Sequence, residues 1–554
     1  MAGGTMLTPE RVSAQQSGVE ELTRGPIHEG FAGSVNFNPE AGILVSSSPP
    51  ENIEEVPPEQ RLKGDNVAWI PGYWAWDGEE KDFIWMSGIW RNLPPGRQWI
   101  PGYWAQADDQ WQWTSGYWAN EDSEEITYLP RPPKSIESGP NVEAPSNNDI
   151  WISGNWTRRE ERYAWTPGYW EPAQSNWSCI PAHYHWTRRG YVFNDGYWDH
   201  SVARRGVMFA PVRFRGDYYR RSGYSFTPLL VISLSVLSDH LFVRPNYGHY
   251  YFGDYYSPRY RDSGYYASHS YFSARRGYDP IYAHKRWQHR EDRDWDRGRI
   301  DNFNFYRDHE DARPGRTWAE VQTRSASKNK DGRNQSAIAQ LLSIYSGQAD
   351  SGKRFQSVNQ NSRDNYIEEG NKIRKFGKER QKVESQSMEK AAKGADKDNR
   401  VSREKFGKSP LAAKKDKQSS GQDNPPKRPG LRNSQPEFDD KSAAPNQKAD
   451  KPGKSDKSDN QRDKGNEQNI TPQKKDSPRP DSQADPKKSS KAKPESGRQS
   501  EAEPKRQEKP DKTQESKRES APAQKQSEQS SEKTSKQKNS KDDPSSDGGK
   551  DNKK

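Results

Sequence analysis

The chain has 554 residues, of which 29% are hydrophobic and 30% charged, and its mean hydropathy is −1.34. This composition excludes one buried core over the whole length, and the lack of an apolar run of about 18 residues excludes a membrane-spanning helix. The net charge of +10 is divided unevenly, with −14 in residues 1–150, +6 in 151–320 and +18 in 321–554. All 20 tryptophans precede Val321, so we expect the folded part there.

Residues 1–65 are predicted to be a leader. Val12-Ser13-Ala14 resembles the small-residue end of a secretory cleavage site, but Met1–Pro9 has neither a basic nor a full apolar region. We therefore expect a truncated signal peptide whose true start lies upstream; the alternative is an ordinary disordered N-terminus. A short helix is expected at residues 19–24, followed by an acidic, proline-rich linker.

A six-residue pattern, W-x-x-G-x-W, recurs about every 14 residues and identifies a repeat protein rather than an enzyme built around one pocket. Six clear hexads are followed by two degenerate copies, Cys179 to Tyr184 and Phe193 to Trp198. A 24-residue insertion separates the fourth hexad from the fifth. The signature positions, structural or binding, are Trp69, Gly72, Trp74, Trp85, Gly88, Trp90, Trp99, Gly102, Trp104, Trp113, Gly116, Trp118, Trp151, Gly154, Trp156, Trp165, Gly168, Trp170, Gly196 and Trp198.

Turn residues such as Asp77-Gly78 lie between hexads, so the fold expected is an all-β repeat module: an antiparallel meander of about eight short, aromatic-rich strands, one per hexad. The spacing favours a glycine inside each strand; a type II turn at Pro71-Gly72 is the alternative. A proline-rich loop, residues 120–149, divides the array into blocks 66–119 and 150–198. The blocks form two sheets, or unite into one sheet or barrel.

These repeats resemble the bacterial WxxGxW (YxWGxW) repeat proteins. The resemblance covers Asn66 to Trp198, about a quarter of the chain, and its motif is specific because it needs two tryptophans at fixed offsets around a glycine. It implies an extracytoplasmic bacterial protein of uncharacterised function. It supplies no catalytic or binding residues.

After the repeats, residues 199–320 are rich in tyrosine, arginine and glycine, and an apolar run near 229–237 predicts one buried strand packed on the repeats. Residues 321–395 form a weakly helical linker, with helices expected at Ser336–Tyr345 and Tyr366–Lys393. From 396 to 554 the chain is a basic tail of Lys, Ser, Asp, Gln and Pro, and we expect it to be disordered.

No catalytic signature is found, so we expect no enzyme, no catalytic residue and no cofactor. His183, His185 and His200 are the nearest approach to a metal cluster, but a third ligand at a diagnostic spacing is missing, and aromatic packing is expected instead. The single cysteine, Cys179, excludes an intramolecular disulfide. It replaces a signature tryptophan and is expected to be buried.

The function expected is that of a non-enzymatic, exported structural or interaction protein of the cell envelope, with a tail that binds polyanionic envelope or matrix material. The alternative is a glycan- or wall-binding module whose tryptophans and tyrosines form sugar platforms; a nucleic-acid binder comes third. Self-association is left open. The location expected is extracytoplasmic, or cytoplasmic if Met1 is the true start.

Overall fold

The computed structural model describes residues 18–326, 338–348, 354–391 and 401–413, with the single residues 426 and 429. All of them belong to the first of two units into which the chain divides, Met1–Ala444. The predicted signal-peptide remnant and most of the predicted tail lie outside the described residues. None of the described helices is long and apolar enough to span a membrane.

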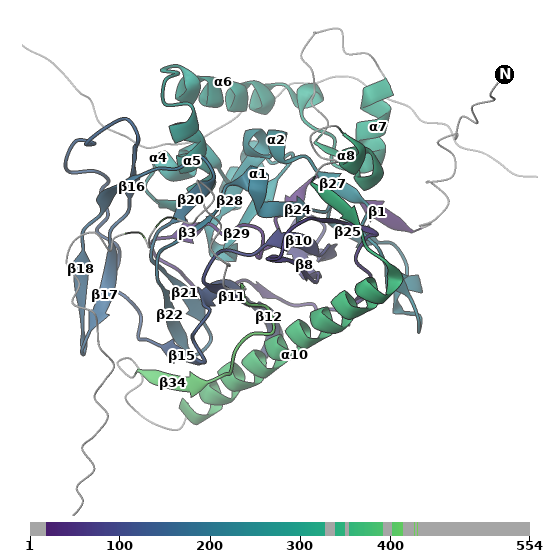
Figure 1. The fold of residues 1–554 in the computed structure, drawn as a ribbon, viewed down its shortest axis with the longest axis horizontal. Helices are drawn as coiled ribbons and strands as arrows, with labels where there is room; N and C mark the ends of the chain where they lie inside the picture. Colours follow the sequence, from purple (N-terminus) through teal and green to yellow (C-terminus); the bar gives the residue numbers. More distant parts are fainter. Residues whose placement is uncertain are drawn as a thin grey trace, which may run out of the picture. The chain divides into compact units, whose positions relative to one another are not determined.

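The eight hexads form four antiparallel hairpins (Figure 1), which confirms the predicted all-β repeat module. Each hexad is one arm of a hairpin, and each arm consists of two short strands with a break between them. Hairpin 1 contains β7 (Val67–Ile70), β8 (Tyr73–Asp77), β9 (Asp82–Met86) and β10 (Ile89–Asn92); hairpin 2 contains β11 (Arg97–Ile100), β12 (Tyr103–Ala107), β13 (Gln110–Thr114) and β14 (Tyr117–Asn120); hairpin 3 contains β16 (Asp149–Ile152), β17 (Asn155–Arg159), β18 (Arg162–Thr166) and β19 (Tyr169–Pro172); hairpin 4 contains β20 (Trp177–Ile180), β21 (His183–Thr187), β22 (Gly190–Asn194) and β23 (Tyr197–His200).

The register of each hairpin pairs the aromatic residues of its two hexads. In hairpin 1, Trp69 lies opposite Trp90 and Trp74 opposite Trp85, with ring centroids 5.0 and 5.3 Å apart in edge-to-face geometry. The other hairpins repeat this register. Within residues 67–200, all of which are described, no hairpin shares a ladder with another, so the array is neither one sheet nor a barrel.

Each arm breaks at the residue pair that ends in the signature glycine, such as Pro71-Gly72. A type II turn requires a positive φ at this glycine, and the signature glycines are not among the described glycines with positive φ. A methyl group at Gly72 would lie 2.2 Å from the carbonyl oxygen of Met86. The glycine is therefore an interior position of the arm, as predicted, and permits close approach of the opposite backbone.

Residues 18–62 add short strands to the edges of several sheets instead of forming a linker. The strands are β1 (Val19–Glu21), β2 (Gly25–Pro26), β3 (Val35–Asn36), β4 (Leu44–Val45), β5 (Glu54–Glu55) and β6 (Gln60–Leu62). The helix predicted at residues 19–24 is wrong, because β1 pairs with the distant β25 (Val212–Phe214). Tertiary pairing here overrides local helix propensity.

Residues 201–326 form a mixed region around the hairpins. Its elements are α1 (Val202–Arg205), β24 (Gly206–Met208), β25, η2 (Tyr218–Arg220), β26 (Ser225–Phe226), β27 (Leu230–Ile232), α2 (Leu234–Leu237), η3 (Ser238–His240), β28 (Leu241–Arg244), η4 (Pro245–Tyr247), β29 (His249–Phe252), α3 (Pro258–Asp262), β30 (Tyr266–Ala267), α4 (Ser268–Ser273), β31 (Gly277–Tyr278), α5 (Pro280–Gln288), α6 (Trp295–Asp308), η5 (Glu310–Ala312) and α7 (Trp318–Ala326).

The strand predicted near residues 229–237 is correct only in its first half. β27 is buried and its Val231 packs with Trp69 and Trp90, so the predicted packing on the repeats is confirmed. The second half is the helix α2, in which Leu234 and Leu237 are buried together because positions three apart share one helical face.

In the described C-terminal segments, the long helix packs on the hairpins and the short strands pair with strands outside them. These segments are β32 (Ala339–Leu341), α8 (Leu342–Gly347), β33 (Phe355–Ser357), α10 (Gln360–Ala391) and β34 (Ser402–Lys405). The helix expected at 366–393 is confirmed as α10 within the described residues. Of the helix expected at 336–345, residues 336–337 lie outside the described residues, 339–341 form the strand β32, and only the part from Leu342 on is helical, in α8. β34 pairs with β15 (Glu125–Tyr128), so ordered structure continues beyond residue 396, where the tail was predicted to start.

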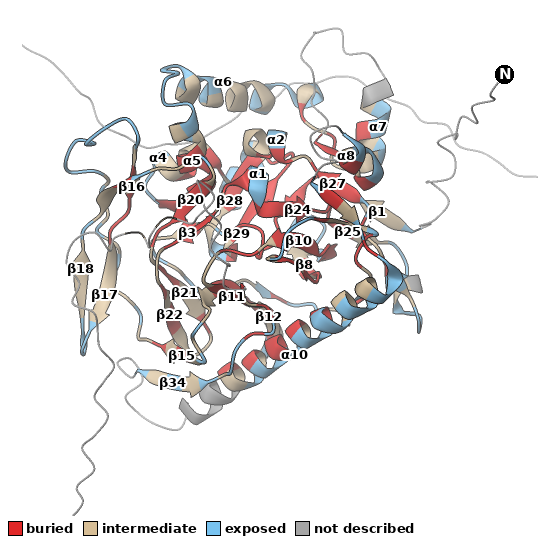
Figure 2. Ribbon diagram, viewed as in Figure 1, coloured by how far each residue is buried: buried red, intermediate tan, exposed pale blue. Residues whose placement is uncertain are grey.

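The helix α10 covers the arm breaks of hairpins 1 and 2 (Figure 1). Its glycines Gly370 and Gly377 face Pro71 and Pro101, the residues before two signature glycines. Arg380, fully buried, donates to the carbonyl oxygens of Pro101 and Ser115 at 2.9 and 3.0 Å. Figure 2 shows buried positions along the inner side of α10 and exposed ones along its outer side.

Candidate carboxylate-binding site

The first tryptophan of a hexad covers the glycine of the opposite hexad. A methyl group at Gly88 would lie 2.5 Å from Cζ2 of Trp69, and one at Gly168 would lie 2.4 Å from Cζ2 of Trp151. The W-x-x-G spacing is therefore a packing rule between two paired arms. A side chain larger than hydrogen at the glycine would displace the indole.

In hairpin 1, the break in the two arms binds the carboxylate of Glu55. The amides of Gly72 and Gly88 donate to Oε2 and Oε1 of Glu55 at 2.7 and 2.8 Å, and Trp85 Nε1 donates to Oε1 at 3.1 Å. Glu55 comes from β5, outside the repeats, and is only 3% exposed. Backbone amides that converge in this way form an anion-binding concavity, and hydrogen bonds to a carboxylate are stronger than neutral ones.

Hairpin 2 binds Glu29 in the same manner. Gly116 N donates to Oε2 of Glu29 at 2.8 Å, and Trp113 Nε1 donates to Oε1 at 2.9 Å. His249 Nε2 lies 3.2 Å from Oε1. Glu29 also comes from residues 18–62 and is 5% exposed. Hairpins 1 and 2 therefore each hold one glutamate of the leader.

Hairpin 3 binds Glu137, from the loop between the two blocks. Trp151 Nε1 donates to Oε1 of Glu137 at 3.0 Å, and Gly154 N donates to Oε2 at 2.5 Å. This site is less enclosed than the other two, because Glu137 and Trp151 are only half-buried. Binding of a carboxylate by an indole N–H and a glycine amide thus recurs in a more accessible part of the molecule.

Hairpin 4 has lost the indole donors of the site. Cys179 and Phe193 stand where the other hairpins have the first tryptophans of their hexads, and Ala182 stands at one glycine position. A methyl group at Gly196 would lie 3.2 Å or more from its neighbours. Loss of the indole thus relaxes the need for glycine. Cys179 is buried opposite Trp198, as expected for a small apolar residue.

Burial and hydrogen-bond donors have opposite effects on the Glu55 carboxyl. Burial is the larger effect and raises the pKa of Glu55, and the amide hydrogen bonds from Gly88 and Gly72 and the positive charge of Arg374 offset it only in part. Arg374 belongs to α10, and its Cζ lies 5.7 Å from the Trp85 ring centroid. All three donors and this charge favour a bound carboxylate over a neutral group.

The signature residues divide between the core and partly exposed positions. The tryptophans of hairpin 1 are buried, whereas Trp104 of hairpin 2 and all four tryptophans of hairpin 3 are half-buried. The buried tryptophans among the signature residues are Trp69, Trp74, Trp85, Trp90, Trp99, Trp113, Trp118 and Trp198; the half-buried ones are Trp104, Trp151, Trp156, Trp165 and Trp170. Hairpin 3 therefore has the most accessible aromatic surface of the four.

Sequence reasoning missed the three glutamates, Glu29, Glu55 and Glu137. Each lies outside the hexads, and its distance from its hairpin along the chain differs from case to case. The one shared signal is a proline three to five residues before the glutamate: Pro26, Pro50 and Pro133. This pattern is too common in the chain to identify the sites without the fold.

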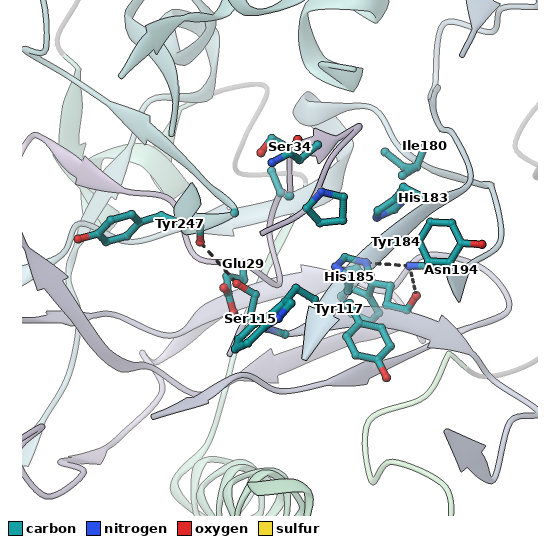
Figure 3. Close-up of a pocket in the computed structure, with 18 of the residues that line it drawn as sticks. Glu29, Ser34, Ser115, Tyr117, Ile180, His183, Tyr184, His185, Asn194 and Tyr247 are labelled. Atoms are coloured by element: carbon teal, nitrogen blue, oxygen red, sulfur yellow. Dashed lines mark hydrogen bonds between the residues drawn. The ribbon is translucent and has the colours of Figure 1, made fainter. Parts of the chain in front are cut away.

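The three histidines considered as metal ligands do not meet. His183 and His185 have ring centroids 4.5 Å apart beside a cavity of about 90 Å³ (Figure 3). His200 instead stacks on Trp177 at 4.6 Å. Burial lowers the pKa of His183 and of His200 to about 4, so both are neutral at pH 7. The described residues contain no group of three metal-ligating side chains.

A larger cavity, of about 700 Å³, lies between hairpin 3 and the helices α4 to α6. Its walls combine flat rings with cationic and acidic groups. Its rings and arginines include Trp151, Trp170, Trp287, Trp295, Arg275 and Arg293. In the described part of the chain, no ion pair is formed by either of these arginines. The cavity can therefore offer both stacking surfaces and positive charge to a ligand.

The fold and the repeated carboxylate site define an all-β protein built of tryptophan-rich hairpins. The family model "WXXGXW repeat (2 copies)" matches residues 64–91, 99–119, 150–178 and 180–200. Each matched segment coincides with one hairpin, so two copies of the repeat are one structural unit. Over these four segments the chain is similar to the WXXGXW repeat family. No curated protein and no solved structure matches it significantly.

Proposed function

We propose that the protein is a non-enzymatic, exported structural and interaction protein of the bacterial cell envelope, in which repeat hairpins bind glutamates of extended segments. One observation carries the proposal: three hairpins hold a glutamate from outside the repeats through glycine and indole N–H donors. These donors present no nucleophile and orient the carboxylate as an acceptor. The arrangement suits binding rather than proton transfer or group transfer.

The proposal includes binding of polyanionic material by the C-terminal part. Residues 321–554 carry a net charge of +18, dominated by lysine, and most of them follow the described segments. Exposed charges of this kind attract polyanions over about 10 Å at ordinary salt. Export is supported by Val12-Ser13-Ala14 and by the family resemblance.

The carboxylate sites are tested by amide hydrogen exchange on the full-length chain. Glu55→Gln replaces one acceptor oxygen by an NH₂ group that faces donors, so exchange at Gly72 and Gly88 should rise at least tenfold. The matched control is Glu54→Gln, an exposed neighbour, which should leave both amides protected. Unchanged exchange in Glu55→Gln would remove the basis of the proposal.

Export and polyanion binding need separate measurements. Fractionation of native cells with mass spectrometry of the mature N-terminus should place the chain in the envelope, cleaved before Gln15. Intact protein beginning at Met1 in the cytosol would refute export. Retention on an anionic wall polymer should fall steeply between low and high salt, because exposed contacts are screened.

The cavity of about 700 Å³ favours one second candidate, a glycan-binding module. Trp151 and Trp170 contribute rings to its wall, and rings of this kind stack on sugar faces. Salt-resistant retention on insoluble wall polysaccharide that is lost in Trp170→Ala would support this candidate. Trp104→Ala, on hairpin 2 and outside the cavity, is the control; equal loss in both variants would point to general unfolding.

A further inference from the structure

We infer that hairpin 3 is an exchangeable peptide-binding site, and that the chain's own segment 130–142 is an internal occupant which an extended, glutamate-containing peptide can replace. The inference rests on the proposed function and names its ligand: a peptide with a proline about four residues before a glutamate. The other two carboxylate sites do not exchange in this way, because their glutamates are buried.

Segment 130–142 lies along hairpin 3 without helix or strand of its own, and each of its residues is described. Hydrogen bonds from the hairpin reach most of its length, and one further bond joins Ser135 N, as donor, to Asn38 Oδ1 at 2.8 Å. Tyr163 Oη donates to the Pro130 carbonyl at 2.6 Å, Trp156 Nε1 to the Lys134 carbonyl at 3.0 Å, and Trp170 Nε1 to the Val142 carbonyl at 3.0 Å. The Glu137 carboxylate occupies the centre.

These contacts specify little sequence apart from the glutamate. The carbonyl acceptors belong to the backbone, which any extended peptide supplies, and the segment Arg131-Pro-Pro-Lys134 favours an extended conformation. Only Glu137 is recognised through its side chain, by Gly154 N and Trp151 Nε1. An unrelated peptide of the same extended form and with one well-placed glutamate therefore meets the same donors.

The internal occupant buries little apolar surface. Ile136 and Val142, its largest aliphatic residues, are 59% and 60% exposed, whereas the residues beside Glu29, such as Ile27 and Phe31, are fully buried. Release of the segment therefore exposes little new apolar area, and the opening free energy should be low. Hydrogen bonds, which water can replace, provide most of the attachment.

The hairpin retains its own packing when the segment leaves. Trp156 and Trp165 pack edge to face at 5.3 Å, and Trp151 and Trp170 do so at 5.4 Å. The five-residue ladder of β17 and β18 does not involve the loop. The donors would thus stay in place, while the tethered segment competes at a high effective concentration.

The test uses a fluorescent peptide with the sequence of residues 129–144 and two full-length chains, wild type and Glu137→Gln. Fluorescence anisotropy should give at least tenfold tighter binding to Glu137→Gln, because its internal competitor is weakened. A peptide carrying Glu137→Gln should bind at least tenfold more weakly than the unmodified peptide. A peptide carrying Glu143→Gln, a nearby carboxylate without a described partner, is the matched control and should bind normally.

Hydrogen exchange at the Gly154 amide tests the internal carboxylate site separately from the exchangeable peptide site. If Glu137→Gln raises this exchange and neither chain binds the peptide, the exchangeable site is refuted while the internal carboxylate sites stand. If Glu137→Gln leaves Gly154 protected, the carboxylate site itself is refuted in hairpin 3. Equal affinity of the two chains would overturn competition by the loop.

Discussion

Hairpins 1 and 3 have the same signature and the same register, and each binds a glutamate through a glycine amide and an indole of one hexad. They differ in the arm that binds, which is the second in hairpin 1 and the first in hairpin 3, and in their surroundings. Hairpin 1 is enclosed by residues 18–62, by β24 and by α10, and both Glu55 and its donor Trp85 are buried. Hairpin 3 contacts the irregular segment 130–142 and, through β16, the helix α5, and its four tryptophans are half-buried. The repeat therefore encodes the binding geometry locally, whereas the rest of the chain decides whether a site is part of the core or accessible.

The largest difference in stability between variants of hairpins 1 and 3 is expected when the signature glycine is replaced by alanine. Gly88→Ala meets Trp69 Cζ2 at 2.5 Å and the Ile70 carbonyl at 2.7 Å inside the core, so it should lower the free energy of unfolding by about 3 kcal/mol or more. Gly168→Ala meets Trp151 Cζ2 at 2.4 Å and the Ile152 carbonyl at 2.7 Å. The partly exposed Trp151 ring can move outward, so the cost should be smaller than for Gly88→Ala, about 2 kcal/mol.

Urea unfolding of the full-length variants measures both losses. Gly196→Ala in hairpin 4 is the internal control: its closest contact would be 3.2 Å, and it should cost below about 1 kcal/mol. Equal losses at all three glycines would contradict the packing rule between indole and glycine.

A smaller difference in stability between the two hairpins is expected when the bound glutamate is replaced by glutamine. Glu55→Gln should lower the free energy of unfolding by about 2 to 3 kcal/mol, because buried N–H donors lose a charged acceptor. Glu137→Gln should cost about 1 kcal/mol or less, since Glu137 and its donor Trp151 are half-buried and water can reach them. Thermal and urea unfolding should agree; a larger loss in Glu137→Gln would reverse the proposed order of the two sites.

The smallest difference in stability comes from the turns of the two hairpins, and it appears only at acid pH. Burial opposes ionisation of Glu79, in the turn of hairpin 1, but hydrogen bonds from Tyr260 and Arg24 outweigh it and lower its pKa to about 2. Its contribution to stability is therefore complete above the unfolded value of 4.5 and is lost as the pH falls from 4.5 towards 2. Glu79→Gln should flatten the stability profile in this window.

The matched control for Glu79 is Glu161, an exposed carboxylate in the turn of hairpin 3. Within the described residues it has no ion pair, so Glu161→Gln should leave the acid limb of the profile unchanged. An equal effect of the two substitutions would show that general charge, and not the contacts of Glu79, sets the acid response.

Part of the fold could be predicted because its signals are local. The 14-residue period, the turn residues between hexads and the interior glycine follow from short-range spacing, and the helix α10 follows from a polar, helix-favouring run. The strands β1 to β6 could not be predicted, since each is only two or three residues long and depends on a distant partner such as β25 or β29. Leu234–Leu237 became helical for a similar reason: burial of two leucines on one face outweighed the alternating pattern.

The sequence by itself determined the repeat, its pairing of aromatic arms and the place of the signature glycine, because these depend on side chains within about 30 residues of one another. Only the tertiary structure decided which glutamates enter the hairpins and how deeply each is buried. Those contacts join residues that are far apart in the chain or at irregular distances, and no periodic signal marks them. Burial also depends on the segments that cover each hairpin, so hexads of the same pattern became a core element in hairpin 1 and an accessible carboxylate site in hairpin 3.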